Sequence, residues 1–143
     1  ITTKDQDGKK WDFSKREMRK RAIEKINKTK PLVITGSPMC TDWSTMMNLN
    51  WDRMDPEEVV RRKRMARVHL EFCAKLYRIQ HEAGRYFVHE HPNAASSWHE
   101  ETIKALCGLE GVLTVSADQC MYGLKTWVRA GTNWCLPRNP RSS

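Results

Sequence analysis

Hydrophobic positions recur along the chain in blocks that predict helices alternating with strands. A helix is expected from Ser14 to about Lys28, where apolar residues recur every four positions. Ser14 and Glu17 would form a capping box at its start. The continuous apolar run over 32–36 then predicts a strand buried on both faces, as in a parallel sheet.

A second block of helix and strand follows. Asp55 is a favourable N-cap, and Pro56 suits the first position of a helix. This helix is expected to be long and to end at Gly84, and 85–90 reads as the next strand. The apolar stripe of the long helix has spacings of four, three and four residues and consists of Ala66, Leu70, Cys73 and Tyr77.

The last third of the chain repeats the alternation. Ser97 and Glu100 would form a capping box that opens another helix, and 111–117 is expected to be a third strand. Helix and strand thus alternate three times, which predicts an α/β fold with an open parallel sheet and helices on both faces. Residues 1–143 would form a single domain, with 124–143 as an irregular tail.

The chain is basic, with a net charge of +8 and an isoelectric point near 9.4. Basic residues cluster at 15–21 and 61–67, and such runs either bind phosphates or form solvated helix faces. No apolar run approaches the ~20 residues of a membrane span, so no membrane partner is expected. The five cysteines include no CxxC pair, which disfavours a structural zinc site. A disulfide framework is also disfavoured, because the chain is longer and richer in predicted helix than the small domains that need one. An intracellular protein, nuclear or cytoplasmic, is expected.

Candidate chemistry lies where two predicted strands end. Cys40 follows the strand 32–36, and Glu90 closes the next strand. Ligands of open α/β sheets bind outside the carboxyl ends of the strands, so a thiol and a carboxylate would share one crevice if these strands are neighbours. Plainer interpretations stay open: Cys40 as a buried structural thiol, and Glu90 in a structural ion pair. A metal site at His89 and His91 is disfavoured, because the spacing fixes no third ligand.

A cysteine and a carboxylic acid in one crevice suit the chemistry of a pyrimidine ring. A thiolate can add to C6 of the ring, which makes C5 nucleophilic towards a methyl donor. A carboxylic acid beside the ring can hold N3 and the exocyclic amine while the thiolate adds. The target base must leave the stack to reach such a pocket.

Two short motifs resemble those of a known family. The stretch "GSPMCTDWS" (36–44) resembles the Gly-x-Pro-Pro-Cys-x-x-Phe-Ser loop of the DNA (cytosine-5) methyltransferases, and "FVHEHP" (87–92) is similar to their strand ending in Phe-x-x-Glu-Asn-Val. The resemblance implies that Cys40 is the nucleophile and Glu90 the cytosine-binding acid. It also implies a partial Rossmann-like sheet, the second half of a class I methyltransferase fold. The substrate-binding residues that it implies are Pro38, Ser44, His91 and Arg129.

A more detailed resemblance is to methyltransferase-like segments carried in mobile-element polyproteins. Those show a series "SP-x-C-T-x-x-S … EHP … DQC-x-YG", which occurs here at 37–44, 90–92 and 118–123. Two function classes follow: a cytosine-5 methyltransferase, or a non-catalytic module that binds nucleic acid or a protein. A third class is the amino-methylating enzymes, with Ser37-Pro38 as a degenerate form of their Ser-Pro-Pro-Tyr loop. It is disfavoured because the aromatic residue that follows the prolines in that loop is missing here.

The sequence also departs from the methyltransferase pattern. Met39 replaces the second proline, His91 stands in place of asparagine, and the Gln-x-Arg-x-Arg signature is absent, with only Lys125 and Arg129 in its region. The implied cofactor is S-adenosylmethionine, but no Gly-rich loop follows an N-terminal strand to bind it. An upstream domain is therefore expected to complete the cofactor site, and the chain alone is predicted to be inactive or nearly so as a methyltransferase.

Overall fold

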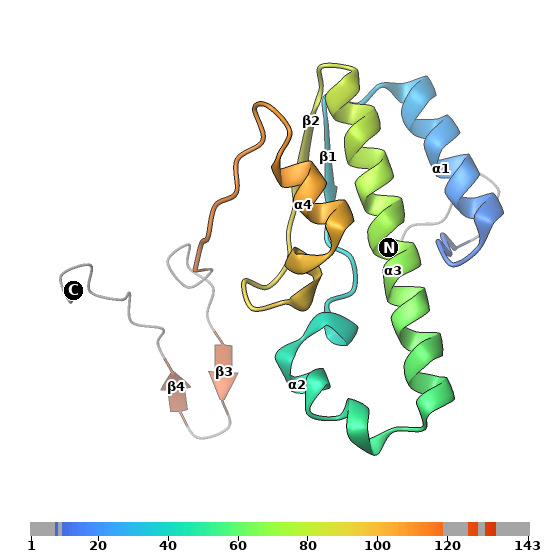
Figure 1. Ribbon diagram of the computed structural model, residues 1–143. Coiled ribbons are helices and arrows are strands. Elements are labelled where there is room, and N and C mark those ends of the chain that lie inside the picture. Colours follow the sequence, from blue (N-terminus) through green and yellow to red (C-terminus); the bar gives the residue numbers. More distant parts are fainter. Residues whose placement is uncertain (1–7, 9, 119–125, 129–130, 134–143) are drawn as a thin grey trace. The chain divides into compact units, whose positions relative to one another are not determined.

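The computed structural model describes residue 8 and residues 10–118, 126–128 and 131–133 (Figure 1). The chain divides into two compact units, Ile1–Val112 and Leu113–Ser143, and each is described by itself. The helices of the first unit are α1 (Arg16–Thr29), α2 (Thr45–Asn48), α3 (Pro56–Glu82) and α4 (Glu101–Cys107). Its strands are β1 (Val33–Gly36) and β2 (Tyr86–His89), and its short 3-10 turns are η1 (Thr41–Trp43), η2 (Trp51–Arg53) and η3 (Ser96–His99). The predicted mixed α/β class is confirmed.

The strands β1 and β2 are neighbours and run parallel. Val33 pairs with Tyr86, and Gly36 pairs with His89. The long helix α3 makes the crossover between them, as a parallel pair requires. Both strands therefore end at the same edge of the sheet, which is the edge where the candidate chemistry was predicted.

Helix α3 has the start and the end that its sequence predicts. The carboxylate of Asp55 accepts a hydrogen bond from the backbone N–H of Glu58, and Pro56 occupies the first helical position. Gly84 follows the last turn with φ +67°, a left-handed conformation that costs glycine little.

The core lies between α3, α4 and one face of the sheet (Figure 1). Tyr77 of α3 is almost fully buried, and its ring stacks on Phe87 of β2 with 4.8 Å between centroids. Leu70 of α3 and Ile103 of α4 are also only 1% exposed. The predicted stripe of α3 is thus the side of the helix that packs on the sheet.

The prediction that 32–36 is buried on both faces was wrong. Exposed and half-buried residues alternate along both strands, and Val33, Tyr86 and Val88 keep about half or more of their surface exposed, at 49%, 66% and 50%. Within the described residues the helices pack on one face of the sheet only. The other face also carries apolar residues, but no described residue packs on them.

Both predicted capping boxes are absent. Helix α1 begins at Arg16 without a side-chain cap, and the hydroxyl of Ser14 donates instead to Asp12 at 2.5 Å. Ser97 lies in η3 and is fully buried, while Glu100 pairs with Arg67 of α3. Three of the four predicted capping side chains, Ser14, Ser97 and Glu100, thus have partners other than the helix end.

The chain from residue 111 onward differs from its prediction in two ways. No strand forms over 111–117, where Leu113 and Val115 are 88% and 80% exposed. The region 124–143, predicted to be irregular, includes β3 (Thr126–Val128) and β4 (Gly131–Asn133), which pair antiparallel. An apolar run is not enough to make a strand, because a strand also needs a neighbour to complete its backbone hydrogen bonds.

Candidate active site at the carboxyl edge of the sheet

The loops that follow β1 and β2 meet directly. The hydroxyl of Ser37 donates to Oε2 of Glu90 at 2.6 Å. The backbone N–H of Glu90 donates to the carbonyl of Gly36 at 3.0 Å, continuing the strand pairing by one residue. The loop that leads to Cys40 is therefore attached to Glu90 by one backbone and one side-chain hydrogen bond.

Cys40 is exposed, so the interpretation of this residue as a buried structural thiol was wrong. It immediately precedes η1, and its carbonyl accepts a hydrogen bond from the backbone N–H of Trp43 at 3.0 Å. Pro38, two residues before it, is buried and anchors the loop. The thiol is thus presented to solvent on a short, internally bonded turn.

Ser44 has a structural task in this turn. Its hydroxyl accepts from the backbone N–H of Met47 at 3.2 Å, which caps α2, and donates to the carbonyl of Thr41 at 3.0 Å. These bonds hold the end of the turn that begins at Cys40. A substrate-binding role for Ser44 stays a prediction.

Glu90 is exposed, and within the described part of the chain no salt bridge reaches it. A structural ion pair therefore does not account for it there. The histidines on either side of Glu90 have lowered pKa values. Burial, and then the neighbouring His91, lowers the pKa of His89 to about 4, and burial also lowers the pKa of His91. Both rings are therefore neutral at neutral pH.

His91 links the two loops, through a contact that sequence reasoning missed. Its ring is 8% exposed, with Nε2 at 3.2 Å from the carbonyl of Pro38 and Nδ1 against the hydroxyl of Ser97. A carbonyl can only accept, so Nε2 carries the proton and Nδ1 accepts from Ser97. Both ring nitrogens are used within the protein, so His91 fixes the position of the Cys40 loop. Ser97 could not be found from sequence, because its hydroxyl was expected to cap a helix.

The remaining predicted site residue, Arg129, lies outside the described residues. Among the residues that are described, no group of three or more histidine, cysteine or acidic side chains is placed to hold a metal. A search of the same residues found no helix with the length and hydropathy needed to cross a membrane.

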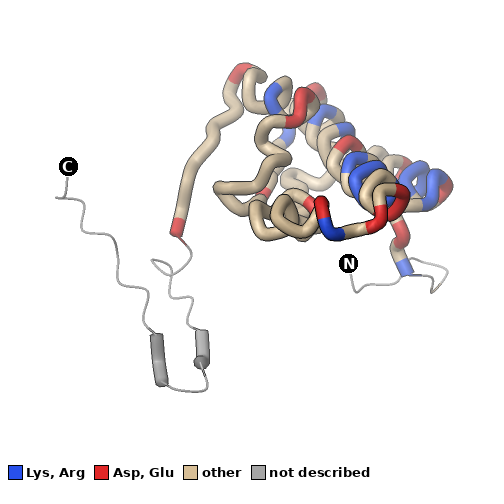
Figure 2. The backbone as a smooth tube through the Cα atoms, turned by 60° about the horizontal axis from the view of Figure 1, so that its bottom comes forward, with Lys and Arg blue, Asp and Glu red and all other residues tan. Residues whose placement is uncertain are grey.

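Acidic positions lie among the basic positions along the helices (Figure 2). Many side chains of the two basic clusters have partners within the protein. In 61–67, several of the positive charges are paired with carboxylates or lie over an aromatic ring. The pairs are Arg61 with Glu58, Arg62 with Asp42, Arg67 with Glu100, and Lys63 over Trp51. In 15–21 the partners are Asp12 for Lys15, Glu24 for Lys20, and the carbonyl of Phe13 for Arg19. The charge available for phosphates is therefore smaller than the sequence suggests.

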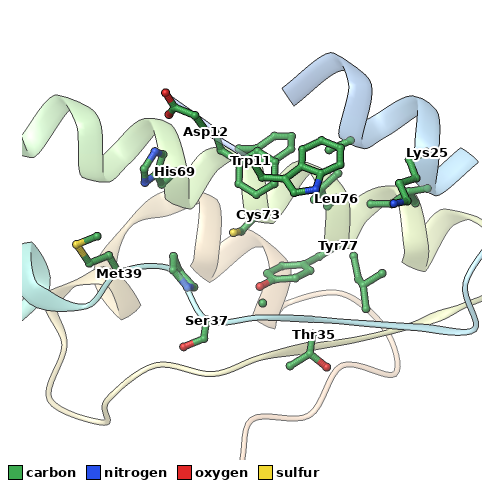
Figure 3. A pocket seen from close by; sticks show the side chains of 17 residues that line it. Trp11, Asp12, Lys25, Thr35, Ser37, Met39, His69, Cys73, Leu76 and Tyr77 are labelled. Carbon is green, nitrogen blue, oxygen red and sulfur yellow. The ribbon is translucent and has the colours of Figure 1, made fainter. Parts of the chain in front are cut away.

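A cavity of about 680 Å³ lies between α1, α3 and β1 (Figure 3). Its wall includes Ser37, Pro38 and Met39, the residues just before Cys40, and the aromatic rings of Trp11 and Phe13. In Figure 3 the α3 side chains, among them His69, Cys73 and Tyr77, lie between Trp11 on one side and Ser37 on the other. Sequence reasoning missed this cavity, because it depends on how α1 packs.

Burial raises the pKa values of Cys73 and Tyr77, which line this cavity. Both side chains therefore stay protonated at neutral pH. Cys73 is thus a poor nucleophile, and its thiol is not a competitor for the role predicted for Cys40.

Comparisons of the chain with protein-family models, with curated proteins and with solved structures found no significant match.

Proposed function

We propose that this chain is the base-binding part of a cytosine-5 methyltransferase-like domain that acts on nucleic acid. Cys40 is the nucleophile at pyrimidine C6, and Glu90 is the acid that holds the cytosine. The observation that carries the proposal is the 2.6 Å hydrogen bond from Ser37 to Glu90 at the end of two adjacent parallel strands. It brings the loop of the exposed thiol to the carboxylate, as attack on a held base requires.

The first chemical step can be written for the residues of this chain. The Cys40 thiolate gives an electron pair to C6, the C5=C6 π pair becomes a C4=C5 double bond, and the C4=N3 π pair moves onto N3. N3 takes the proton of the Glu90 carboxyl group, which leaves a carboxylate and a neutral adduct with a nucleophilic C5. Ser37 occupies only one oxygen of Glu90, which leaves the other to contact the base.

The described residues fit a methyl donor only in part. S-adenosylmethionine would supply an electrophilic methyl group to C5. The cavity beside the Cys40 loop has the volume of a nucleoside-sized ligand site, and Trp11 and Phe13 offer aromatic faces to a purine. However, none of the described residues provides a Gly-rich turn there. Gly36 lines the cavity, but the space beside it is filled by Tyr77, whose hydroxyl oxygen would lie 2.0 Å from a Cβ built at Gly36. We therefore derive no methyl-transfer step, and an upstream domain is proposed to complete the donor site.

The uncovered face of the sheet supports the same proposal. Parallel sheets occur almost only where both faces are covered, yet Val33, Tyr86 and Val88 are exposed. We propose a partial Rossmann-like sheet, the second half of a class I methyltransferase fold, whose other helices come from a further part of the protein. An intracellular location, nuclear or cytoplasmic, agrees with a nucleic-acid substrate.

The alternative is a non-catalytic module of a mobile-element polyprotein that binds nucleic acid or a protein. Two observations favour it. Much of the charge in 15–21 and 61–67 is paired within the protein, and the exposed sheet face is apolar enough to bind a protein partner.

The two functions are separated by exchange of the hydrogen at C5. Addition of Cys40 to C6 lets C5 take a proton from water, so DNA or RNA that contains [5-³H]cytosine should lose tritium without any methyl donor. We expect Cys40→Ser to abolish the release and Glu90→Gln to slow it by a factor of about 100 or more. Cys107→Ser is the matched control, because Cys107 is also an exposed thiol.

Each outcome of the tritium assay decides between the two functions. Tritium release that depends on Cys40, without transfer from labelled S-adenosylmethionine, supports the proposal that the donor site is completed elsewhere. Methyl transfer by this chain alone would overturn the proposed need for an upstream domain. Binding of nucleic acid with no tritium release would overturn the enzymatic proposal and leave the non-catalytic module.

A further inference from the structure

The cavity between α1, α3 and β1 is too large to be a packing defect. Its volume is about 680 Å³, whereas side chains in protein interiors interdigitate and leave few voids larger than a water molecule. Part of the space arises because α1 presents a small side chain there, that of Ala22, which is buried and lines the cavity. The volume therefore suits a small-molecule site.

Part of the cavity wall is a row of aromatic rings. The rings of Trp11 and Phe13 lie 5.7 Å apart between centroids, and those of Phe13 and Phe72 lie 4.9 Å apart. Figure 3 also shows two sulfur-containing side chains of the lining, Met39 and Cys73. Aromatic rings and sulfur atoms both make favourable contacts with the ring of a ligand. This wall therefore favours a planar aromatic compound over a flexible aliphatic chain.

The charges of the lining leave no excess of either sign. Asp12 and Lys25 are the lining side chains that are always charged at neutral pH, and their charges cancel. The Asp12 carboxylate accepts from the backbone N–H and the hydroxyl of Ser14, and its other oxygen lies 3.6 Å from the ammonium of Lys15. The ammonium of Lys25 lies 5.7 Å from the centre of the Trp11 ring. Because burial of an unpaired charge is costly, the lining favours an uncharged ligand.

Two hydroxyl groups of the lining are already used within the protein. Ser37 donates to Glu90, and the Tyr77 oxygen lies 3.2 Å from Nδ1 of His89. These groups are therefore poorly placed to bind a strongly polar ligand, and apolar contacts would carry most of the affinity.

We propose that this cavity binds an uncharged, planar aromatic compound of about two or three rings, with Met39 packed against it. S-adenosylmethionine is a poorer match, because its sulfonium, ammonium and carboxylate groups would meet no unpaired counter-charges in the lining. The proposal does not rest on the proposed function, because neither Cys40 nor Glu90 lines the cavity.

The direct test uses a matched pair of fluorescent probes with the full chain. N-phenyl-1-naphthylamine is uncharged, and 1-anilinonaphthalene-8-sulfonate is the same ring system with a sulfonate group. The uncharged probe should bind with one molecule per chain and gain fluorescence. The sulfonate should bind about tenfold more weakly, because its charge finds no unpaired partner. Equal affinities would overturn the assignment of an uncharged ligand.

Substitutions locate the bound probe. Ala22→Phe should fill part of the cavity and weaken binding of N-phenyl-1-naphthylamine about tenfold, with thermal melting as a check that the variant folds. Ala105→Phe is the matched control, because Ala105 is exposed on α4 and does not line the cavity. Val88→Lys, on the uncovered sheet face, should leave the affinity unchanged. Binding that survives Ala22→Phe and is lost in Val88→Lys would place the probe on the sheet and overturn the proposal.

Met39 gives a readout that needs no substitution in the core. With ¹³C-labelled methionine methyl groups, the ring of N-phenyl-1-naphthylamine should shift the Met39 signal, which Met39→Ala assigns among the seven. The same variant should weaken binding about threefold, whereas Met46→Ala, at an equally exposed methionine outside the lining, should not. A Met39 signal that does not move while the probe binds would overturn the contact with Met39.

Competition separates this ligand from the methyl donor. S-adenosylmethionine should not displace N-phenyl-1-naphthylamine, because its charged groups have no partners in the lining. Displacement that is lost in Ala22→Phe would make the cavity a donor site and overturn the uncharged ligand. Tritium release from cytosine tests the proposed function separately, because it depends on Cys40 and not on this cavity.

Discussion

The two faces of the β1–β2 sheet have the same backbone and register but different surroundings. On one face, Ile34 and Phe87 pack against α3, where Tyr77 stacks on Phe87. On the other face, Val33 and Tyr86 are exposed. Both faces are apolar, so composition does not distinguish them. The difference teaches that an apolar strand residue stabilises this unit only where a helix of the same unit is long enough and close enough to cover it.

The largest contrast is expected from alanine substitutions at the neighbouring residues Phe87 and Tyr86. Phe87→Ala should lower the free energy of unfolding by about 3 kcal/mol, because it removes the ring against which Tyr77 stacks. Tyr86→Ala should cost less than about 1 kcal/mol, because its side chain is on the exposed face. Urea denaturation of the two variants measures both values. Equal losses would mean that the exposed face is covered in solution.

A smaller effect is expected from Gly36→Ala. The added Cβ would lie 2.0 Å from the hydroxyl oxygen of Tyr77 and 2.9 Å from Cζ, and this ring is buried between α3 and the sheet. Overpacking of this kind should cost about 2 kcal/mol. Thr35→Ala, on the exposed face, should cost about 0.5 kcal/mol or less.

Tyr77→Phe sharpens the Gly36 experiment. It removes the hydroxyl that the new Cβ would meet, so Gly36→Ala should cost less in that background. An unchanged cost of Gly36→Ala in the Tyr77→Phe background would exclude the hydroxyl as the source of the strain and locate it in the remaining ring or in the backbone.

The smallest effect is a pH dependence of the free energy of unfolding, which is expected from His89 on the covered face. The pKa of His89 is lowered to about 4 from about 6.5, so the unfolded chain binds a proton between these values while the folded chain does not. Stability is therefore complete above pH 6.5, falls as the pH drops towards 4, and changes no further for this group below that. With allowance for solvent screening, the loss should be about 1–2 kcal/mol.

Urea denaturation between pH 4 and 8 checks this prediction. His89→Gln should flatten most of the slope, and the remainder should come from His91, whose pKa is lowered in the same direction. His99→Gln is the control, because His99 is exposed. A slope that survives His89→Gln unchanged would assign the pH dependence to other groups.

Local chemistry in the sequence was enough to predict several elements. Asp55 and Pro56 start α3, and Gly84 follows its end, because caps act through the nearest backbone groups. The alternation of helix and strand also predicted a parallel sheet, but that β1 and β2 are neighbours was only a condition until the structure showed their pairing. The predictions failed where a side chain chose between partners: Ser14 bonds Asp12, and Ser97 bonds His91.

The sequence by itself determined the order of the longer helices and the two parallel strands in 16–108, but not the short helix α2, and it determined the chain positions of Cys40 and Glu90. Tertiary structure alone decided that Ser37 bonds Glu90, that His91 holds Pro38, and that one face of the sheet stays uncovered. The physical reason is the sequence separation over which each kind of interaction acts. Caps, turns and helical periodicity act between residues a few positions apart, whereas these three features join residues more than 50 positions apart or depend on what does not pack on the strands. Their energies exist only once α3 has brought β1 and β2 together.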